Sequence, residues 1–128
     1  MPSLEITIPL PPRATHPNAR PHWRTLAKAK KQQRGDAFLS AKDAIGRSAA
    51  PRFVRATILA TFYKPGTQAK TMDSDGMVAW LKATADGLQD AQVIVNDSGL
   101  TWLPPKELLG AAAGGERKVV LLVSSLDG

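Results

Sequence analysis

The chain of 128 residues has 17 Lys and Arg against 11 Asp and Glu, a net charge of +6, and no cysteine. This length suits one domain, residues 1–128, with a core of its own, and the lack of cysteine excludes a thiolate nucleophile, a zinc–thiolate site and an iron–sulfur cluster. Because no apolar run is long enough to span a bilayer and the N-terminus does not resemble a secretion signal, we expect a cytoplasmic protein without a membrane partner.

The first half of the chain predicts a strand, a loop and a long helix. Apolar and polar residues alternate over residues 4–8, which predicts a half-buried strand that ends at Pro9. A proline-rich loop follows over residues 11–21. Over residues 25–45, strong helix formers and an apolar stripe predict a helix, with Gly46 as its stop. Lysines and arginines between the apolar positions make the exposed side of this helix basic.

The second half predicts three strands and a second helix. Residues 52–63 form a long β-type run, with Val54 and the alternate residues after it on one face. Asp73 or Ser74 caps a helix that runs to about Leu88. The remaining strands, separated by a loop that contains Pro104 and Pro105, are predicted over residues 92–95 and 118–123. This β–α–β–α–β–β order predicts an α+β (mixed α/β) domain in which two helices pack on one mixed sheet.

The charge is unevenly divided along the chain. Residues 1–70 hold 13 Lys and Arg against 3 Asp and Glu, for +10, whereas residues 71–128 hold 4 against 8, for −4. A basic half beside an acidic half fits a polyanion-binding surface next to a cation-binding site. The alternative is that the basic residues only keep one face of a helix soluble.

Three aspartates in the acidic half are candidate metal ligands. Asp73 and Asp75 lie one residue apart at the predicted start of a helix, and Asp97 follows the predicted strand over residues 92–95. Grouped carboxylates bind Mg²⁺, with water and a substrate phosphate in the remaining positions. The same residues also have simple structural roles, since Asp73 and Asp75 can cap a helix and Asp97 can form a turn. In a basic chain, the pattern favours a metal-dependent enzyme that acts on nucleic acid.

A continuous helix would bring Lys82 and Asp86 back to the face of Asp75, because they follow it by seven and eleven residues. At about 1.5 Å per residue, Asp86 would lie about 16 Å from Asp75, too far to share its metal. Lys82 would lie about 10 Å away, within reach of its flexible side chain. We therefore expect Lys82 to stabilise charge on a phosphate, and Asp86 to form a surface ion pair with Lys82.

The order of these motifs resembles the RusA family of Holliday-junction resolvases over most of the chain, from Leu4 to about Trp102. The family shows an Asp-x-Asp-Asn helix start, a helix lysine, an Asp-Gly/Ala-Leu segment and a strand that ends in Asp-Asp, preceded by an Asn and Trp segment. Two positions differ: Gly76 replaces the usual Asn, and Asn96 replaces the first acid of Asp-Asp. The matching residues here are Asn18, Trp23, Asp73-Ser74-Asp75, Lys82, Asp86-Gly87-Leu88 and Asp97.

The resemblance implies an active site and a substrate. Asp73, Asp75 and Asp97 would hold Mg²⁺ and, with Lys82, form the catalytic set. The substrate would be a four-way DNA junction, and the two coordinated nicks that resolve it imply a homodimer. Six basic residues of the loop and the first helix are expected to contact DNA phosphates: Arg20, Arg24, Lys28, Lys30, Lys31 and Arg34.

The sequence thus predicts a Mg²⁺-dependent endonuclease that resolves branched DNA in recombination, repair or phage DNA processing. One alternative is a non-catalytic branched-DNA-binding protein that lost efficient chemistry through Gly76 and Asn96. Another is a structural or adaptor protein whose acids only cap a helix. Trp23 either stacks on a base or anchors its loop to the core, and His16 and His22 are expected to have loop or packing roles.

Overall fold

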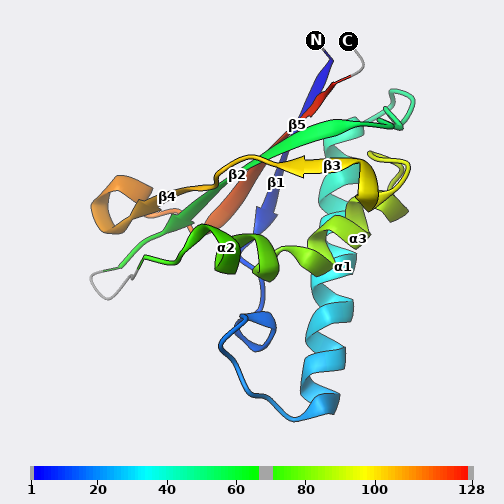
Figure 1. Cartoon of the computed structure of the whole chain (residues 1–128). Helices are drawn as coiled ribbons and strands as arrows, with labels where there is room; N and C mark the ends of the chain where they lie inside the picture. The colour runs from blue at the N-terminus through cyan, green and yellow to red at the C-terminus, as the bar shows by residue number, and fades with distance from the viewer. Residues whose placement is uncertain (1, 67–70, 127–128) are drawn as a thin grey trace.

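The computed structural model describes residues 2–66 and 71–126 of the chain (Figure 1). Within this part, strands and helices alternate much as the sequence predicts, and the expected α+β class is confirmed. No helix in these residues combines the length and the apolar character that crossing a bilayer requires. In chain order the elements are β1 (Ser3–Pro9), α1 (Trp23–Ile45), β2 (Ala56–Lys64), α2 (Ser74–Trp80), α3 (Lys82–Asp90), β3 (Leu100–Trp102), β4 (Lys106–Leu109) and β5 (Lys118–Ser125).

The strands form one mixed sheet in the order β1-β5-β2-β3, and β4 also pairs with β2. β5 is antiparallel to both β1 and β2, whereas β3 and β4 run parallel to β2. The central pairing of β2 with β5 extends from Ala56 opposite Ser125 to Tyr63 opposite Lys118. Segments from the middle and the end of the chain therefore form the centre of the sheet.

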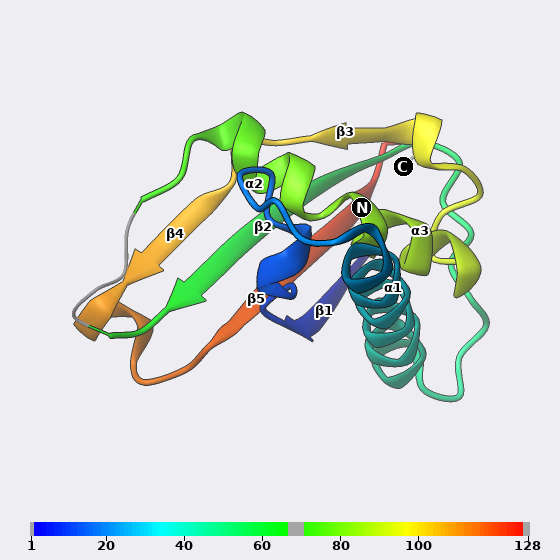
Figure 2. The ribbon, with the colours of Figure 1, turned by 90° about the horizontal axis from the view of Figure 1, so that it is seen from below.

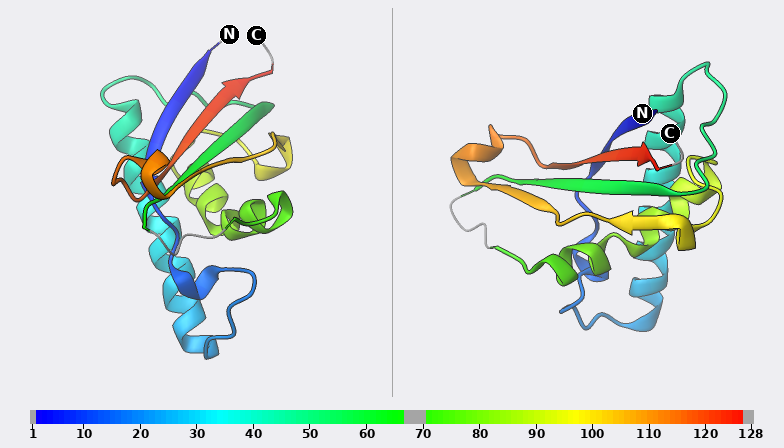
Figure 3. Two further views of the ribbon diagram at one scale, coloured as in Figure 1. Left: turned by 90° about the vertical axis from the view of Figure 1, so that its left-hand side faces the viewer. Right: turned by 45° about the horizontal axis from the view of Figure 1, so that its top comes forward.

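The core lies between the sheet and the helices, which pack on one of its faces (Figure 2, Figure 3). The period of two in the strands selects the buried side chains, because successive residues point to opposite faces of a sheet. On β2 these include Ile58 and Phe62, and on β5 they include Leu121 and Val123, all with no exposed surface. Full burial of each such side chain contributes about 1.5–3 kcal/mol.

The predicted helix from residue 73 to residue 88 is in fact two helices, α2 and α3, separated at Leu81. Leu81 has φ −95° and ψ 9°, which interrupts the regular hydrogen-bond ladder. The side chain of Gln33, buried on α1, donates one hydrogen bond to the Trp80 carbonyl at 2.6 Å and another to Thr84 Oγ1 at 3.0 Å. This buried amide stabilises the break, so the expected single face of Asp75, Lys82 and Asp86 does not form.

Close approach between α1 and α3 requires a glycine at position 87. A Cβ atom at Gly87 would collide with the Arg34 carbonyl oxygen and would lie 2.7 Å from the Cβ atom of Ala37. Beyond the break at Leu81, α3 packs on α1 through this position. Gly87, the centre of an Asp-Gly-Leu motif, is thus a helix-packing residue.

Two strand predictions are wrong. Residues 92–95 form only an isolated parallel bridge, between Ile94 and Phe53, and Val54, predicted on the core face, is 62% exposed. The chain around this bridge is irregular, because Arg52 and Gln92 adopt positive φ values of 49° and 63°. The loop around Pro104 and Pro105 contains two strands that the sequence did not predict, β3 and β4. Both strands are short, because the prolines between them have no backbone N–H to donate to a neighbouring strand.

Candidate functional site

Asp73 and Asp75 line a hollow of about 750 Å³ between α2 and the loop that precedes α1. The other polar residues of this hollow include His16 and Asn18 from the loop and Lys64 from the end of β2. Both aspartates are exposed. The fold therefore combines an acid pair with side chains of a loop more than fifty residues earlier in the chain and with Lys64 from the preceding strand.

The Asp73 side chain caps α2, as the sequence predicts. Its Oδ1 atom accepts a hydrogen bond from the Gly76 backbone N–H at 2.9 Å. A Cβ atom added at Gly76 would collide with this same Oδ1 atom, so glycine leaves room for the cap. A carboxylate has two oxygens and about four acceptor sites, so one cap does not exhaust its capacity for a cation.

Asp75 follows in the first turn of α2 and lies beside two hollows. The second hollow, of about 450 Å³, separates α2 from Trp102 at the end of β3 and from the segment before β4 that contains Pro104. This position gives the Asp75 carboxylate access to ligands on either side of α2. Trp102 is half-buried here.

Lys64 and Glu107, which no sequence motif singled out, form an ion pair at the wall of the acid hollow. Their Nζ and Oε2 atoms lie 2.6 Å apart, and the two side chains are only 13% and 11% exposed. Glu107 Oε1 also accepts the backbone N–H of Met72 at 3.1 Å. The two residues are 43 positions apart in the sequence, and the pairing of β2 with β4 brings them together. No local sequence pattern could therefore predict this contact.

The loop before α1 is held at the hollow by Trp80, which is almost completely buried. The indole stacks on Phe62 with ring centres 5.9 Å apart, and the His16 ring meets it edge-on at 5.1 Å. The indole N–H donates to the carbonyl of Pro12 at 3.1 Å. His16 Nδ1 accepts the backbone N–H of Asn18 at 3.1 Å. The expected packing role of His16 therefore also places it in the hollow.

Lys82 and Asp86 line a different hollow from Asp75. This groove, of about 350 Å³, lies between α1 and α3, and its other charged residues are Lys30, Lys31 and Arg34. The break at Leu81 turns Lys82 away from the acid pair and toward these basic residues. The structure thus groups Lys82 with expected DNA-binding residues, and its expected role beside the metal stays a prediction.

Asp97 lies apart from the acid pair in the fold. It begins a 3-10 turn, Asp97–Gly99, at the opposite end of β3 from Trp102, and its backbone N–H donates to the Gln89 side chain at 3.2 Å. Asn96 caps this turn by accepting the Ser98 N–H at 3.0 Å. Across residues 2–66 and 71–126, no three His, Asp or Glu side chains are grouped to hold one metal ion. The structure brings Asp73 and Asp75 together, but not Asp97 with them.

The six expected DNA-binding residues are all exposed. Successive residues in the set Arg24, Lys28 and Lys31 are four and three positions apart, so they lie on one side of α1. The guanidinium of Arg20 donates to the backbone carbonyl of Ala19 at 2.9 Å, so it is held beside its own loop. This surface is available to a polyanion.

Arg34 differs from the others because it pairs with Asp90 at the end of α3. Its guanidinium makes two parallel hydrogen bonds to the carboxylate, at 2.6 Å and 2.8 Å. These bonds raise the pKa of Arg34 and hold the pKa of Asp90 below its ordinary value. Asp90 therefore competes with a phosphate for Arg34.

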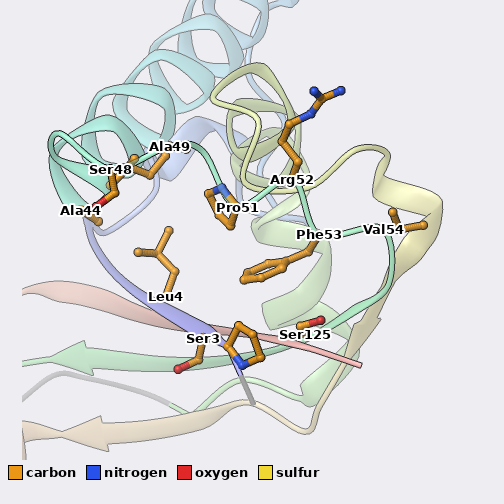
Figure 4. A pocket seen from close by; sticks show the side chains of 12 residues that line it. Ser3, Leu4, Ala44, Ser48, Ala49, Pro51, Arg52, Phe53, Val54 and Ser125 are labelled. Carbon is orange, nitrogen blue, oxygen red and sulfur yellow. The ribbon is translucent and has the colours of Figure 1, made fainter. Parts of the chain in front are cut away.

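A further hollow, of about 560 Å³, is mainly apolar and separate from the acids (Figure 4). It lies between the end of α1 and the start of β1, with Leu4, Ile45 and Phe53 among its walls. Arg52 is the one charged residue among those that line it. The hollow lacks the acid–base groups that chemistry on a phosphodiester requires, so it is not the candidate site.

No model of a known protein family matches the chain. A protein of Xylella fastidiosa (strain Temecula1 / ATCC 700964), described as an uncharacterized protein, is 40% identical to the chain over 88 residues. The match covers 67% of the chain and 56% of that relative, so the chain spans just over half of the relative's length. The description of this relative assigns no activity.

Proposed function

We propose that the protein is a Mg²⁺-dependent endonuclease that cuts phosphodiester bonds in branched DNA, as its resemblance to the RusA family implies. The observation that carries this proposal is the arrangement around Leu81. On one side of it, Asp73 and Asp75 share a hollow, and on the other side Lys82 shares a groove with three basic residues of α1. A cation site next to a polyanion site is the combination that a metal-dependent nuclease needs.

The acid pair fits Mg²⁺ by the chemistry of its donors. Mg²⁺ prefers hard oxygen ligands and is commonly held by one or two carboxylates together with water and substrate phosphates. Asp73 and Asp75 are exposed carboxylates in one hollow, and the Asp73 cap involves only one of its two oxygens. When bound, Mg²⁺ would polarise the phosphate and lower the pKa of the attacking water. Asp97 as a third ligand stays a prediction.

The remaining side chains would position the DNA. Lys64, whose ammonium is paired with Glu107 at the wall of the acid hollow, would meet negative charge that develops on a phosphate bound there. Lys82, Lys30 and Lys31 would hold the backbone of a neighbouring nucleotide in the groove between α1 and α3. The six basic residues from Arg20 to Arg34 would then contact phosphates farther along the arms.

A four-way junction is the proposed substrate, because the resemblance implies a resolvase. Resolution requires two coordinated nicks, so the active form would be a homodimer with one acid hollow in each subunit. The protein would act in the cytoplasm, on DNA intermediates of recombination, repair or phage DNA processing.

A non-catalytic DNA-binding protein is the second candidate, and the Asp73 cap favours it. The Asp73 carboxylate already has a structural partner in the Gly76 N–H, and Gly76 and Asn96 stand where the family has Asn and Asp. Such a protein would keep the basic surface and bind junctions without cutting them.

Incubation with a synthetic four-way junction separates the two candidates. The strands are labelled one at a time, and the protein is added with Mg²⁺, with Ca²⁺ or with a chelator. An endonuclease is expected to give paired nicks with Mg²⁺ only, and to retard the junction under all three conditions. Retarded migration of the junction in a gel without nicks supports the binding protein. If the protein neither retards nor nicks the junction, the structural or adaptor interpretation is supported.

A further inference from the structure

The first residue of α1 is an exposed tryptophan. Trp23 is 67% exposed, although indole rings usually stabilise a protein by removing a large apolar surface from water. The His22 ring stacks on the indole at 5.7 Å with 29° between the planes, and the Arg24 guanidinium lies 5.1 Å from the ring centre. The ring therefore does not anchor its loop to the core, and it is held as an aromatic surface that faces solvent.

The charges near Trp23 in the sequence are all positive. Residues 6–35 contain seven Lys and Arg and no Asp or Glu. Arg24, Lys28 and Lys31 are exposed on one side of the helix that Trp23 begins. A ligand that matches both features carries negative charge and flat aromatic rings. Nucleic acid has both, since its phosphates meet the cations while a base stacks on the indole.

We propose that Trp23 stacks on an unpaired base, so that the protein prefers DNA with exposed bases to closed duplex. In a duplex the bases stack on one another and offer only their edges in the grooves. The indole can therefore reach a base only at a junction centre, a fork or a single strand. This inference rests on DNA as the ligand of the proposed function, but it needs neither Mg²⁺ nor cleavage.

The test compares two probes without metal ion. One is an oligothymidylate of about 16 nucleotides, and the other is a fully paired hairpin with the same number of phosphates. Trp23→Ala is expected to weaken binding of the single strand about 5- to 150-fold, the range for one stacked base. Hairpin affinity is expected to stay within about two-fold, and Trp23→Phe to keep most of the single-strand affinity.

Tryptophan fluorescence gives a second readout. A base stacked on Trp23 is expected to quench the emission of the wild-type protein. The part of the quench that comes from stacking is expected to disappear in Trp23→Phe, and any quench that remains would come from Trp80, which is buried in the core, or from Trp102, which is half-buried at the end of β3. The loss of quench without loss of folding would assign the contact to the Trp23 ring itself.

Leu39 supplies a matched control on the same helix. It is apolar and 66% exposed, as Trp23 is, but it has no aromatic ring. Leu39→Ala is expected to leave both affinities unchanged. The double variant Lys28→Gln/Lys31→Gln is expected to lower the affinity for both probes by the same factor. It is also expected to make both affinities depend less on salt concentration.

Several outcomes would overturn the inference. Equal weakening of both probes by Trp23→Ala would make Trp23 a residue that only supports the helix end. A changed oligomeric state in ultracentrifugation, with unchanged DNA affinity, would assign the ring to a second copy of the chain. If the wild-type protein binds or nicks a junction and Trp23→Ala behaves identically on every probe, the stacking role of Trp23 is refuted while the proposed function stands. If the wild-type protein binds no DNA at low salt, the proposed function fails with it.

Discussion

The ammonium group of Lys64 lies 2.6 Å from a carboxylate oxygen of Glu107, and both side chains are largely shielded from water. The same carboxylate accepts the backbone N–H of Met72, the residue directly before Asp73. The pair thus joins the end of β2 and the middle of β4 to the point where the chain enters α2. This interaction therefore contributes both to stability and to the geometry of the acid hollow.

Loss of the Glu107 charge is expected to destabilise the fold. Glu107→Gln leaves the Lys64 ammonium in a poorly hydrated site without its carboxylate, and breaking a buried pair in this way costs about 3–5 kcal/mol. Partial exposure reduces this cost, so we expect about 1–3 kcal/mol in urea unfolding. Glu116→Gln is the control, because Glu116 pairs with Lys118 at the same 2.6 Å but is 56% exposed. It is expected to cost less than about 1 kcal/mol, and equal costs would contradict the shielding argument.

Lys64 and Lys82 are expected to affect different steps. Lys64→Met removes the cation at the acid hollow and breaks its pair with Glu107, so the single-turnover nicking rate, measured where the variant stays folded, is expected to fall about 100-fold or more with junction affinity largely kept. Lys82→Met removes one cation of the groove between α1 and α3, so affinity and its salt dependence are expected to fall instead. Melting curves control for folding of both variants. The reverse pattern would return Lys82 to the catalytic role that the family resemblance implies.

Asp75→Asn is expected to abolish most cleavage while the protein stays folded. The change keeps the side-chain volume but removes the charge that binds Mg²⁺, so nicking is expected to fall by about two orders of magnitude or more. Junction binding is expected to persist or tighten, because one anion facing the phosphates is gone. Asp86→Asn, in the other groove, is the control and is expected to keep its nicking rate. Wild-type cleavage by Asp75→Asn would remove Asp75 from the site.

The ion pair of Arg34 with Asp90 predicts a dependence on pH. Because Arg34 lowers the pKa of Asp90 in the folded protein, the pair stabilises the fold at neutral pH. This stabilisation is lost as the pH falls through that lowered pKa, where Asp90 takes up a proton. Asp90→Asn removes this part of the acid sensitivity, which thermal melts at neutral and acidic pH measure.

The same variant tests the competition for Arg34. Without the Asp90 carboxylate, the guanidinium is free for phosphate, so Asp90→Asn is expected to bind DNA more tightly and with a steeper salt dependence. If Asp90 and DNA compete for Arg34, Arg34→Gln is expected to bind DNA more weakly and with a shallower salt dependence. Unchanged affinity in Asp90→Asn would show that Arg34 does not contact the DNA.

Gly87 and Gly35 are expected to respond oppositely to alanine. A methyl group at position 87 collides with the Arg34 carbonyl and the Ala37 side chain, so α1 and α3 must separate. Gly87→Ala is therefore expected to cost about 1–3 kcal/mol. Gly35, inside α1, has no atom within 4 Å of an added Cβ, so Gly35→Ala is expected to stabilise the protein by up to about 1 kcal/mol. Two variants of equal stability would mean that the helices adjust freely.

The local pattern of the sequence determined much of the fold. Alternation over residues 4–8 and 52–63 predicted most of the buried side chains of β1 and β2, with Val54 as the exception, and helix formers ending at Gly46 predicted α1 within a few residues. The Asp73 cap and the acid pair could also be predicted from the sequence, because both involve residues that are close neighbours along the chain. The resemblance to a nuclease family came from the order of such short motifs.

Only the tertiary structure decided how the motifs are grouped. The break at Leu81 is bridged by Gln33, whose amide reaches the Trp80 carbonyl from 47 positions away. The ion pair of Lys64 with Glu107 forms where β2 pairs with β4. Such contacts join residues that no periodicity links, so a sequence read in windows treats residues 73–88 as one helix and puts Lys82 beside Asp75. The physical reason is that propensity acts within a few residues, whereas a buried hydrogen bond or ion pair between distant segments can outweigh it and redirect a side chain to another surface.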